Sequence, residues 1–393
     1  MARPRALLLS PEAPYPLWGG GALRTASVLH YLAQRYELDV LLFREPHAGD
    51  PALALPEGLA ARTGVIELPH HARTFSARIK RNVVRLARGV PPLWDRFAGF
   101  EDNMSKFIEG RSYEVAVLEH FWCAPYLRTV RRAANRVVMN LHNVESALHS
   151  RFGEAEGGAA RWAHGRFAQA YERLEREWLP QFELLLAASE EDARRLNGMN
   201  VVVYPNSVPH YAQPVWAHGD RRPVVAFSGN MEYHPNVQAV RWFAREIWPH
   251  IRRACPEAEW VLIGKNEQAI RGLVAGIPGV RCTGMVDDAV GELGQAAVAV
   301  VPLLSGSGTR LKILEAWAAG TPVVSTAVGA EGLGAAEQLP IEIAGNAGEF
   351  SATVLRLLRD PTRRAKLAIH GRRRYEESFT WEAAWKVLSG AGL

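Results

Sequence analysis

The segment 306–324 reads GSGTRLKILEAWAAGTPVV and combines three features of a ligand-binding α/β connection. Its leading glycines free the backbone, a helix is predicted to begin near Thr309 and end at Gly320, and a buried strand follows. The start of such a helix presents unpaired N–H groups and the positive end of the helix dipole. Arg310 and Lys312 add positive charge beside it. This combination suits a diphosphate group.

Glu315 lies about two turns into the predicted helix and is its only acidic residue. A carboxylate there can accept hydrogen bonds from two hydroxyl groups of a sugar or a ribose. The alternative is an ordinary α/β connection that carries a surface glutamate. Glycine, hydroxyl and cationic residues occur together at the start of this one helix. That combination favours a binding site over an ordinary connection.

Apolar runs typical of buried strands alternate with amphipathic helices along the chain, which is the pattern of parallel α/β sheets. The expected strands cover residues 7–9, 38–43, 115–118, 137–141, 184–188, 201–204, 224–228, 260–263, 280–282, 298–301 and 323–325. Pro205 and Asn206 interrupt the alternation, which restarts at residue 224. We therefore predict two doubly wound domains. Their bounds are 1–205 and 223–374, with a linker at 206–222 and a last helix at 375–393.

Three consecutive strands of the second domain are followed by glycine. These positions are Gly229 with Asn230, Gly264 with Lys265, and Gly284 with Met285 and Val286. Each is a common turn by itself, but the carboxyl ends of parallel strands line one crevice. Together they mark the second domain as the nucleotide-binding one.

The first domain carries two weaker signals. A loop with Gly20 and Gly21 follows the first strand and opens a helix, where bare backbone N–H groups can approach a ligand. The loop does not fit a dinucleotide fingerprint, because the third glycine is missing and eight residues separate Ser10 from Gly19. A flexible loop without chemistry is the alternative. His142 ends a strand where α/β proteins bind ligands, although this turn also suits a helix cap. His120 ends the preceding strand with a weaker signal of the same kind.

Composition excludes several classes of protein. The chain has 393 residues, 48% hydrophobic and 22% charged, which is ordinary for a globular protein. A formal net charge of +5 does not imply nucleic-acid binding. The three cysteines are scattered, so we expect no disulfide framework, no cysteine-based zinc site and a reducing, cytoplasmic setting. No apolar run approaches the roughly 18 residues of a membrane span.

At these motifs the chain resembles the retaining GT-B glycosyltransferases of family four. The segment 306–324 resembles the signature helix of that family most specifically. The segments 227–236 and 260–264, together with Gly284, follow in the family's order. The first glycine loop, His142 and the linker also match. The resemblance implies two Rossmann-like domains facing a central cleft, an N-terminal acceptor-binding domain and a last helix that crosses back to it.

The resemblance also implies roles for individual residues. The second domain is expected to bind a nucleotide-diphosphate sugar, with Glu315 on the ribose hydroxyls and Gly308 and Thr309 beside the phosphates and the sugar. Ser307 departs from the family, because the first glutamate of its motif belongs there. The usual phosphate clamp near Asn230 is also replaced, so Arg310 and Lys312 are expected to supply its charge.

The expected site is therefore defined by two sets of residues. Those expected to act in catalysis are His142, Arg310, Lys312 and Glu315. Those expected to contact the donor are Gly20, Gly21, Gly229, Asn230, Gly264, Lys265, Met285, Val286, Ser307, Gly308, Thr309 and Glu315. No D-x-D or H-E-x-x-H motif is present, so neither a metal nor a cofactor is expected beyond the donor substrate.

The predicted function is sugar transfer with retention from a nucleotide-diphosphate sugar, in the synthesis of cell-envelope polysaccharide or glycoconjugate. The acceptor is a glycan, a lipid-linked sugar or a small molecule. Two alternatives stay open: a GT-B sugar-nucleotide epimerase, which would need its own acid–base set, and a non-catalytic nucleotide-sugar-binding protein, which Ser307 suggests.

A predicted helix after residue 73 bears on the localisation of the protein. Its apolar residues recur at helical spacing, and the same segment carries six cations and no acid. The apolar positions are Phe75, Ile79, Val83, Leu86 and Val90. Such a helix can lie on an anionic membrane surface. We therefore expect a cytoplasmic protein with weak, salt-sensitive peripheral membrane binding. The alternative is an ordinary helix that packs its apolar face into the core.

Overall fold

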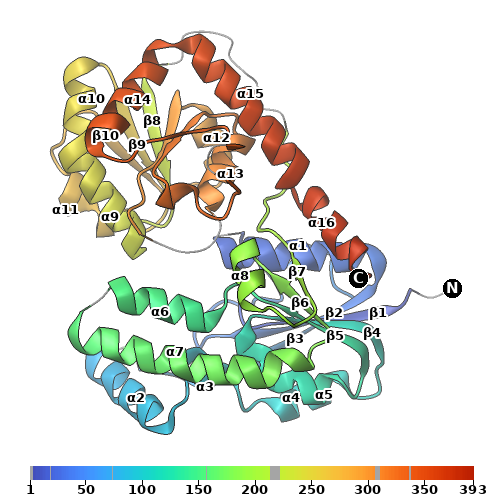
Figure 1. Ribbon diagram of the computed structural model, residues 1–393. Helices are drawn as coiled ribbons and strands as arrows, with labels where there is room; N and C mark the ends of the chain where they lie inside the picture. Colours follow the sequence, from blue (N-terminus) through green and yellow to red (C-terminus); the bar gives the residue numbers. More distant parts are fainter. Residues whose placement is uncertain are drawn as a thin grey trace. The chain divides into compact units, whose positions relative to one another are not determined.

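The computed structural model describes residues 3–17, 19–72, 74–155, 157–212, 222–305, 310–335 and 338–393. The chain divides into two compact units, Met1–Asn206 with Trp385–Leu393, and Ser207–Ala384 (Figure 1). The first unit therefore extends one residue into the predicted linker. The predicted terminal segment 375–393 is shared, because only its last nine residues belong to the first unit.

The first unit is built on a parallel sheet with the strand order β3-β2-β1-β4-β5-β6-β7 over the described residues. Its strands are β1 (Arg5–Ser10), β2 (Glu37–Arg44), β3 (Arg62–Glu67), β4 (Tyr113–Glu119), β5 (Ala134–Asn140), β6 (Leu184–Ala187) and β7 (Val201–Val203). Leu8 of β1 pairs with Val40 on one side and Val117 on the other. The central strands are almost wholly apolar because helices cover both faces of the sheet.

Helices flank this sheet on both sides, with α1 on one side and α4, α5 and α7 on the other (Figure 1). Their bounds are α1 (Gly20–Arg35), α2 (Phe75–Arg88), α3 (Pro92–Phe97), α4 (Glu101–Ile108), α5 (Leu127–Val130), α6 (Glu145–Ala155), α7 (Gly158–Trp178) and α8 (Glu190–Arg195). The chain's last residues attach to α1, where Trp385 Nε1 donates to the Ser27 carbonyl at 3.0 Å.

The second unit repeats the architecture with the strand order β10-β9-β8-β11-β12-β13. Its strands are β8 (Val224–Ser228), β9 (Glu259–Ile263), β10 (Val280–Gly284), β11 (Val298–Val301), β12 (Val323–Ser325) and β13 (Ile341–Ile343). Its helices are α9 (His234–Trp242), α10 (Trp248–Ala254), α11 (Arg271–Val274), α12 (Ala289–Gly294), α13 (Leu311–Ala318), α14 (Ala347–Arg359) and α15 (Pro361–Ser378). Helix α16 (Trp381–Gly390) begins in this unit and ends in the first. The predicted class, two doubly wound α/β units, is confirmed.

Each sheet has one point at which the strand order reverses. In the first unit it lies between β1 and β4, and in the second between β8 and β11. The helices on either side of such a point leave the sheet in opposite directions, so a crevice opens at the carboxyl ends of the strands. The predicted site residues flank both points: Gly20 and Gly21 follow β1, and Gly229 follows β8.

Helix α2 does not pack as an ordinary core helix. Phe75 is 77% exposed, Ile79 is 47% exposed and Val83 is 58% exposed. Arg85 is the only buried residue that α2 contributes, and it forms an ion pair with Asp95 at 2.9 Å. Phe75, Ile79 and Val83 therefore do not face the core, whereas Leu86 and Val90, the other two positions of the stripe, are half-buried. Among the described residues, no helix is both long and apolar enough to cross a membrane.

Candidate functional site

In the second unit, Lys312 and Gly229 meet beside the point where the strand order reverses. The Lys312 ammonium donates to Asn236 Oδ1 at 2.9 Å and lies 4.9 Å from the centre of the Phe227 ring. A Cβ placed on Gly229 would lie 3.1 Å from Lys312 Nζ. Glycine therefore lets the backbone after β8 pass directly beside this cation, and Lys312 points toward the predicted crevice.

Glu315 lies one turn further along α13 on the same side. It accepts a hydrogen bond from Ser228 Oγ, the last residue of β8, at 3.4 Å. Burial raises the pKa of Glu315, while the nearby Lys312 ammonium opposes that rise. Burial also lowers the pKa of Lys312 to about 8. The two groups form a half-buried pair of opposite charge at the carboxyl end of β8.

Arg310 turns away from this pair. Helix α13 begins at Leu311, two residues later than predicted, and Arg310 occupies its N-cap with a non-helical backbone. The buried guanidinium donates from Nη2 to the Val328 carbonyl at 3.0 Å and lies 3.4 Å from a carboxylate oxygen of Glu331. The two predicted cations thus point to different places, and the Arg310 side chain ties α13 to the segment after β12.

The glycine turns predicted after β8 and β9 lie against each other. A Cβ on Gly264 would lie 2.0 Å from the Gly229 carbonyl oxygen, so only glycine fits there. Asn230 is held on both sides, because its carbonyl accepts from Asn236 Nδ2 at 2.8 Å and its Oδ1 accepts from Asn266 Nδ2 at 2.9 Å. These contacts fix the backbone at the carboxyl ends of β8 and β9.

The remaining predicted donor contacts fall into three groups. Lys265 is half-buried, and its carbonyl accepts from the backbone N–H of Met231. Met285 is exposed and Val286 half-buried in the turn after β10. Ser307, Gly308 and Thr309 lie outside the described residues.

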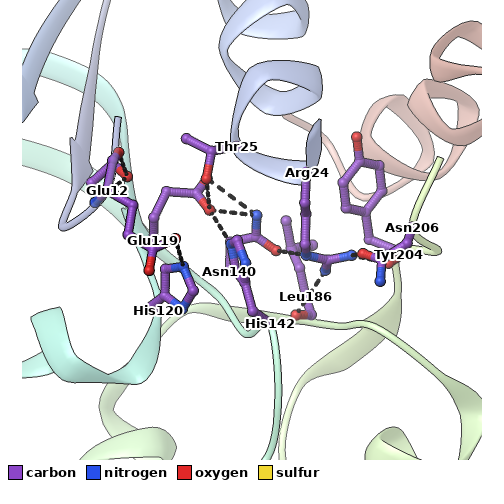
Figure 2. A network of polar contacts seen from close by, with 11 residues as sticks. Glu12, Arg24, Thr25, Glu119, His120, Asn140, His142, Leu186, Tyr204 and Asn206 are labelled. Atoms are coloured by element: carbon purple, nitrogen blue, oxygen red, sulfur yellow. Dashed lines mark hydrogen bonds and ion pairs between the residues drawn. The ribbon is translucent and has the colours of Figure 1, made fainter. Parts of the chain in front are cut away.

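In the first unit, three polar side chains converge at the start of α1. A Cβ on Gly21 would lie 2.9 Å from Glu12 Oε2, 3.7 Å from His142 Nδ1 and 3.9 Å from His120 Nε2. Figure 2 shows these side chains beside Glu119. The rings of His120 and His142 stack with their centres 3.5 Å apart. Gly20 opens the helix next to this cluster.

Glu119 holds His142 in place. The Glu119 carboxylate accepts from His142 Nε2 at 2.7 Å, from Asn140 Nδ2 at 2.9 Å and from Thr25 Oγ1 at 3.3 Å. Burial lowers the pKa of His142 well below its ordinary value, so the ring is neutral. With Nε2–H donated to Glu119, Nδ1 is left as an acceptor toward Gly21.

The environment of His120 differs from that of His142. The His120 side chain is buried, yet neither ring nitrogen has a hydrogen-bond partner among the described residues. The Glu12 carboxylate lies 3.8 Å from Nε2. Buried polar atoms are almost always paired, so these nitrogens point to a ligand or a water.

Arg24 connects the polar cluster around Glu119 to the ends of neighbouring strands through hydrogen bonds. It is 2% exposed and donates to Asn140 Oδ1 at 2.9 Å, to the Tyr204 carbonyl at 2.6 Å and to Asn206 Oδ1 at 3.0 Å (Figure 2). The sequence interpretation missed Arg24, Glu12 and Asn236. The one signal for Arg24 is a cation inside the apolar face of α1.

Across the described ranges, no group of three or more histidine, cysteine, aspartate or glutamate side chains could hold a metal ion. That the protein needs neither metal nor cofactor stays a prediction.

Comparisons with known proteins agree with this architecture. Residues 222–360 match the model of the family described as glycosyl transferases group 1. No curated protein sequence matches the chain. Sucrose-phosphate synthase from Thermosynechococcus elongatus aligns with a TM-score of 0.74 at 17% identity, covering 99% of this chain and 98% of that one.

Two further solved structures are similar over nearly their whole length. HepE of Anabaena, in complex with UDP and glucose, aligns with a TM-score of 0.66 at 14% identity and covers 99% of both chains. WaaG, a glycosyltransferase involved in lipopolysaccharide biosynthesis, aligns with a TM-score of 0.64 at 13% identity, covering 97% of this chain and 99% of that one. These likenesses establish the shared fold, and the family match is confined to residues 222–360. The second unit thus resembles the group 1 glycosyltransferases over residues 222–360, and the whole chain shares the GT-B fold of these solved structures.

Proposed function

We propose that this protein transfers a sugar from a nucleoside-diphosphate sugar to a hydroxyl acceptor with retention of anomeric configuration. The observation that carries the proposal is that Lys312 and Glu315, two neighbouring groups of opposite charge, lie at the end of β8, where the strand order of the second sheet reverses. This place offers one cation, one carboxylate and half-buried glycine backbone at the carboxyl end of β8. A nucleoside diphosphate needs those three partners.

On the donor side, Glu315 accepts the ribose hydroxyls and Lys312 faces the diphosphate. Cleavage of the sugar–phosphate bond builds negative charge on the leaving diphosphate, and a preorganised cation stabilises that charge as it develops. Lys312 suits this role better than Arg310, because Arg310 already binds the Val328 carbonyl. Complexes of HepE with UDP support a uridine nucleotide as the first donor to try.

On the acceptor side, the cluster at Gly21 meets the sugar. His142 Nδ1 and the Glu12 carboxylate accept hydrogen bonds from hydroxyl groups, and the backbone N–H groups at the start of α1 donate. Two carboxylates near this cluster disfavour a bound anion and favour a neutral, hydroxyl-rich group. Retention fits a transfer in which the acceptor attacks from the face that the diphosphate leaves.

A thermal-shift screen of nucleotides and nucleotide sugars tests donor binding. A ligand that binds only the native state raises the melting temperature by mass action. We expect UDP-glucose or another nucleoside-diphosphate sugar to stabilise the protein, and free glucose at the same concentration to leave it unchanged. If no nucleoside diphosphate or its sugar raises the melting temperature, the donor assignment is wrong.

We further propose that α2 carries the protein to an anionic membrane surface, where envelope acceptors are built. Three exposed apolar side chains, Phe75, Ile79 and Val83, recur along the helix. The exposed cations Arg78 and Lys80 stand among them, and α2 contains no acid. An apolar stripe among cations complements acyl chains beneath anionic headgroups.

Sedimentation with liposomes tests this contact. At low salt we expect binding to vesicles containing phosphatidylglycerol and little binding to pure phosphatidylcholine, because each cation near the surface contributes about 1 kcal/mol. Raising the salt should release the protein. Replacing Ile79 and Val83 by serine should weaken sedimentation, whereas Leu53→Ser, at an exposed position elsewhere, should not. Equal recovery with both vesicle types would refute the contact.

A further inference from the structure

A cavity of about 400 Å³ lies in the first unit, next to the polar cluster at Gly21. Small-molecule sites span about 300–1,000 Å³, so it is large enough for a ring or a short chain. It opens at the carboxyl ends of β1, β2 and β3, and α3 closes one side. The apolar side chains that line it include Phe43, Pro51, Leu68, Leu93, Phe97 and Trp122.

Both arginines of the cavity wall are already paired with carboxylates. Arg96 binds the Glu45 carboxylate with two hydrogen bonds, at 2.7 and 3.2 Å, and donates to the Pro69 carbonyl at 2.8 Å. Arg44 forms an ion pair with Glu67. Arg96 is therefore neutralised by Glu45 of the same wall and Arg44 by Glu67 outside the lining, so neither guanidinium is free to select a phosphate. The cavity lining favours an apolar group.

Glu12 joins the cavity to the polar cluster. It lines the cavity, and its carboxylate also lies 3.8 Å from His120 Nε2. A row of stacked rings makes the same connection: Phe97 and Trp122 lie 5.6 Å apart between centres, and Trp122 and His120 lie 4.3 Å apart. The apolar rings of the cavity wall are thus continuous with the imidazole of His120. The nitrogens of that imidazole have no hydrogen-bond partner in the described part of the chain.

We infer that this cavity binds the apolar aglycone of the acceptor and places the acceptor's hydroxyl group between Glu12 and His120. The inference rests on the proposed glycosyl transfer and names its acceptor class: a hydroxylated molecule that carries an apolar ring or chain. The hydroxyl can donate to the Glu12 carboxylate, and the buried His120 nitrogens gain a partner. A sugar without an aglycone would leave the cavity unfilled.

Binding of three glucosides in the presence of UDP tests the inference. The probes are methyl, 4-nitrophenyl and octyl glucoside, with dissociation constants measured by NMR titration. We expect the 4-nitrophenyl or the octyl glucoside to bind roughly tenfold or more tighter than methyl glucoside, because it buries its aglycone. Tighter binding of 4-nitrophenyl glucoside indicates an acceptor with an apolar ring, and tighter binding of octyl glucoside indicates one with an apolar chain. Equal affinities for all three, or no binding by any, would overturn the inference.

A variant that fills the cavity tests whether the aglycone binds there. Ala48 lines the cavity and is exposed, so Ala48→Trp fills the space without displacing core side chains. We expect this variant to lose the preference for the larger glucosides. Ala54 is an exposed alanine of the same loop outside the cavity lining, and Ala54→Trp should keep the preference. An unchanged preference in Ala48→Trp would contradict the assignment. UDP-glucose binding by the unmodified protein, measured in parallel, tests the donor proposal separately.

Discussion

Glu315→Ala should weaken the binding of UDP-glucose about 10- to 150-fold, the equivalent of roughly 1.5–3 kcal/mol for hydrogen bonds to a charged group. The carboxylate lies at the end of β8 and accepts a hydrogen bond from Ser228, so it has acceptor capacity left for two ribose hydroxyls. Calorimetry measures the affinity, and the melting temperature shows that the variant is folded.

The matched control is Glu246→Ala, which removes an exposed glutamate of the same unit. Its carboxylate accepts a hydrogen bond from Trp242 Nε1. The affinity of this variant for UDP-glucose should equal that of the unmodified protein. An unchanged affinity in folded Glu315→Ala would remove this residue from the donor site, even if the protein still bound the nucleotide elsewhere.

Arg24→Met should destabilise the first unit by about 3–5 kcal/mol, which is the usual cost of removing one partner from a buried charged network. The change leaves the Tyr204 carbonyl, Asn140 Oδ1 and Asn206 Oδ1 without their donor. It also removes a positive charge near the buried Glu119 carboxylate, whose pKa burial already raises. For a unit of this size, the melting temperature should fall by roughly 6–20 °C.

Arg35→Met serves as the control, because Arg35 lies on the same helix but is exposed at its last turn. Differential scanning calorimetry should place its transition close to that of the unmodified protein. If Arg24→Met melted within a degree or two of Arg35→Met, the network would not hold the strand ends as described.

The strands that could be predicted and those that could not differ in their apolar sequence pattern. Central strands such as β1 and β11 are buried on both faces, so their sequences are continuous apolar runs. Strands β3 and β13 were missed, and each lies at the edge of its sheet. The sequence of β3 is RTGVIE and that of β13 is IEI, so neither shows an apolar run. Edge position alone does not hide a strand, because the edge strands β7 and β10 were predicted.

The candidate site divides in the same way. Lys312 and Glu315 could be predicted because they lie on one helix whose spacing carries the signal. Arg24 could not, because its partner Asn140 lies 116 residues away and only the folded sheet brings them together. For helix α2 the sequence left two interpretations open. Its periodic apolar stripe fits a core helix and a membrane-surface helix equally well, and only the folded structure shows that Phe75 is exposed.

The measurement that tests the central claim most directly is proton NMR of the anomeric signals during a reaction with UDP-glucose and 4-nitrophenyl glucoside. The account predicts that UDP accumulates while a new glycosidic signal appears with the same α configuration as the sugar in the donor. A new β-linked product would contradict retention. Isomerised nucleotide sugar without transfer would identify an epimerase, and tight donor binding with no change in any signal would identify a binding protein; either result would contradict the proposed glycosyl transfer.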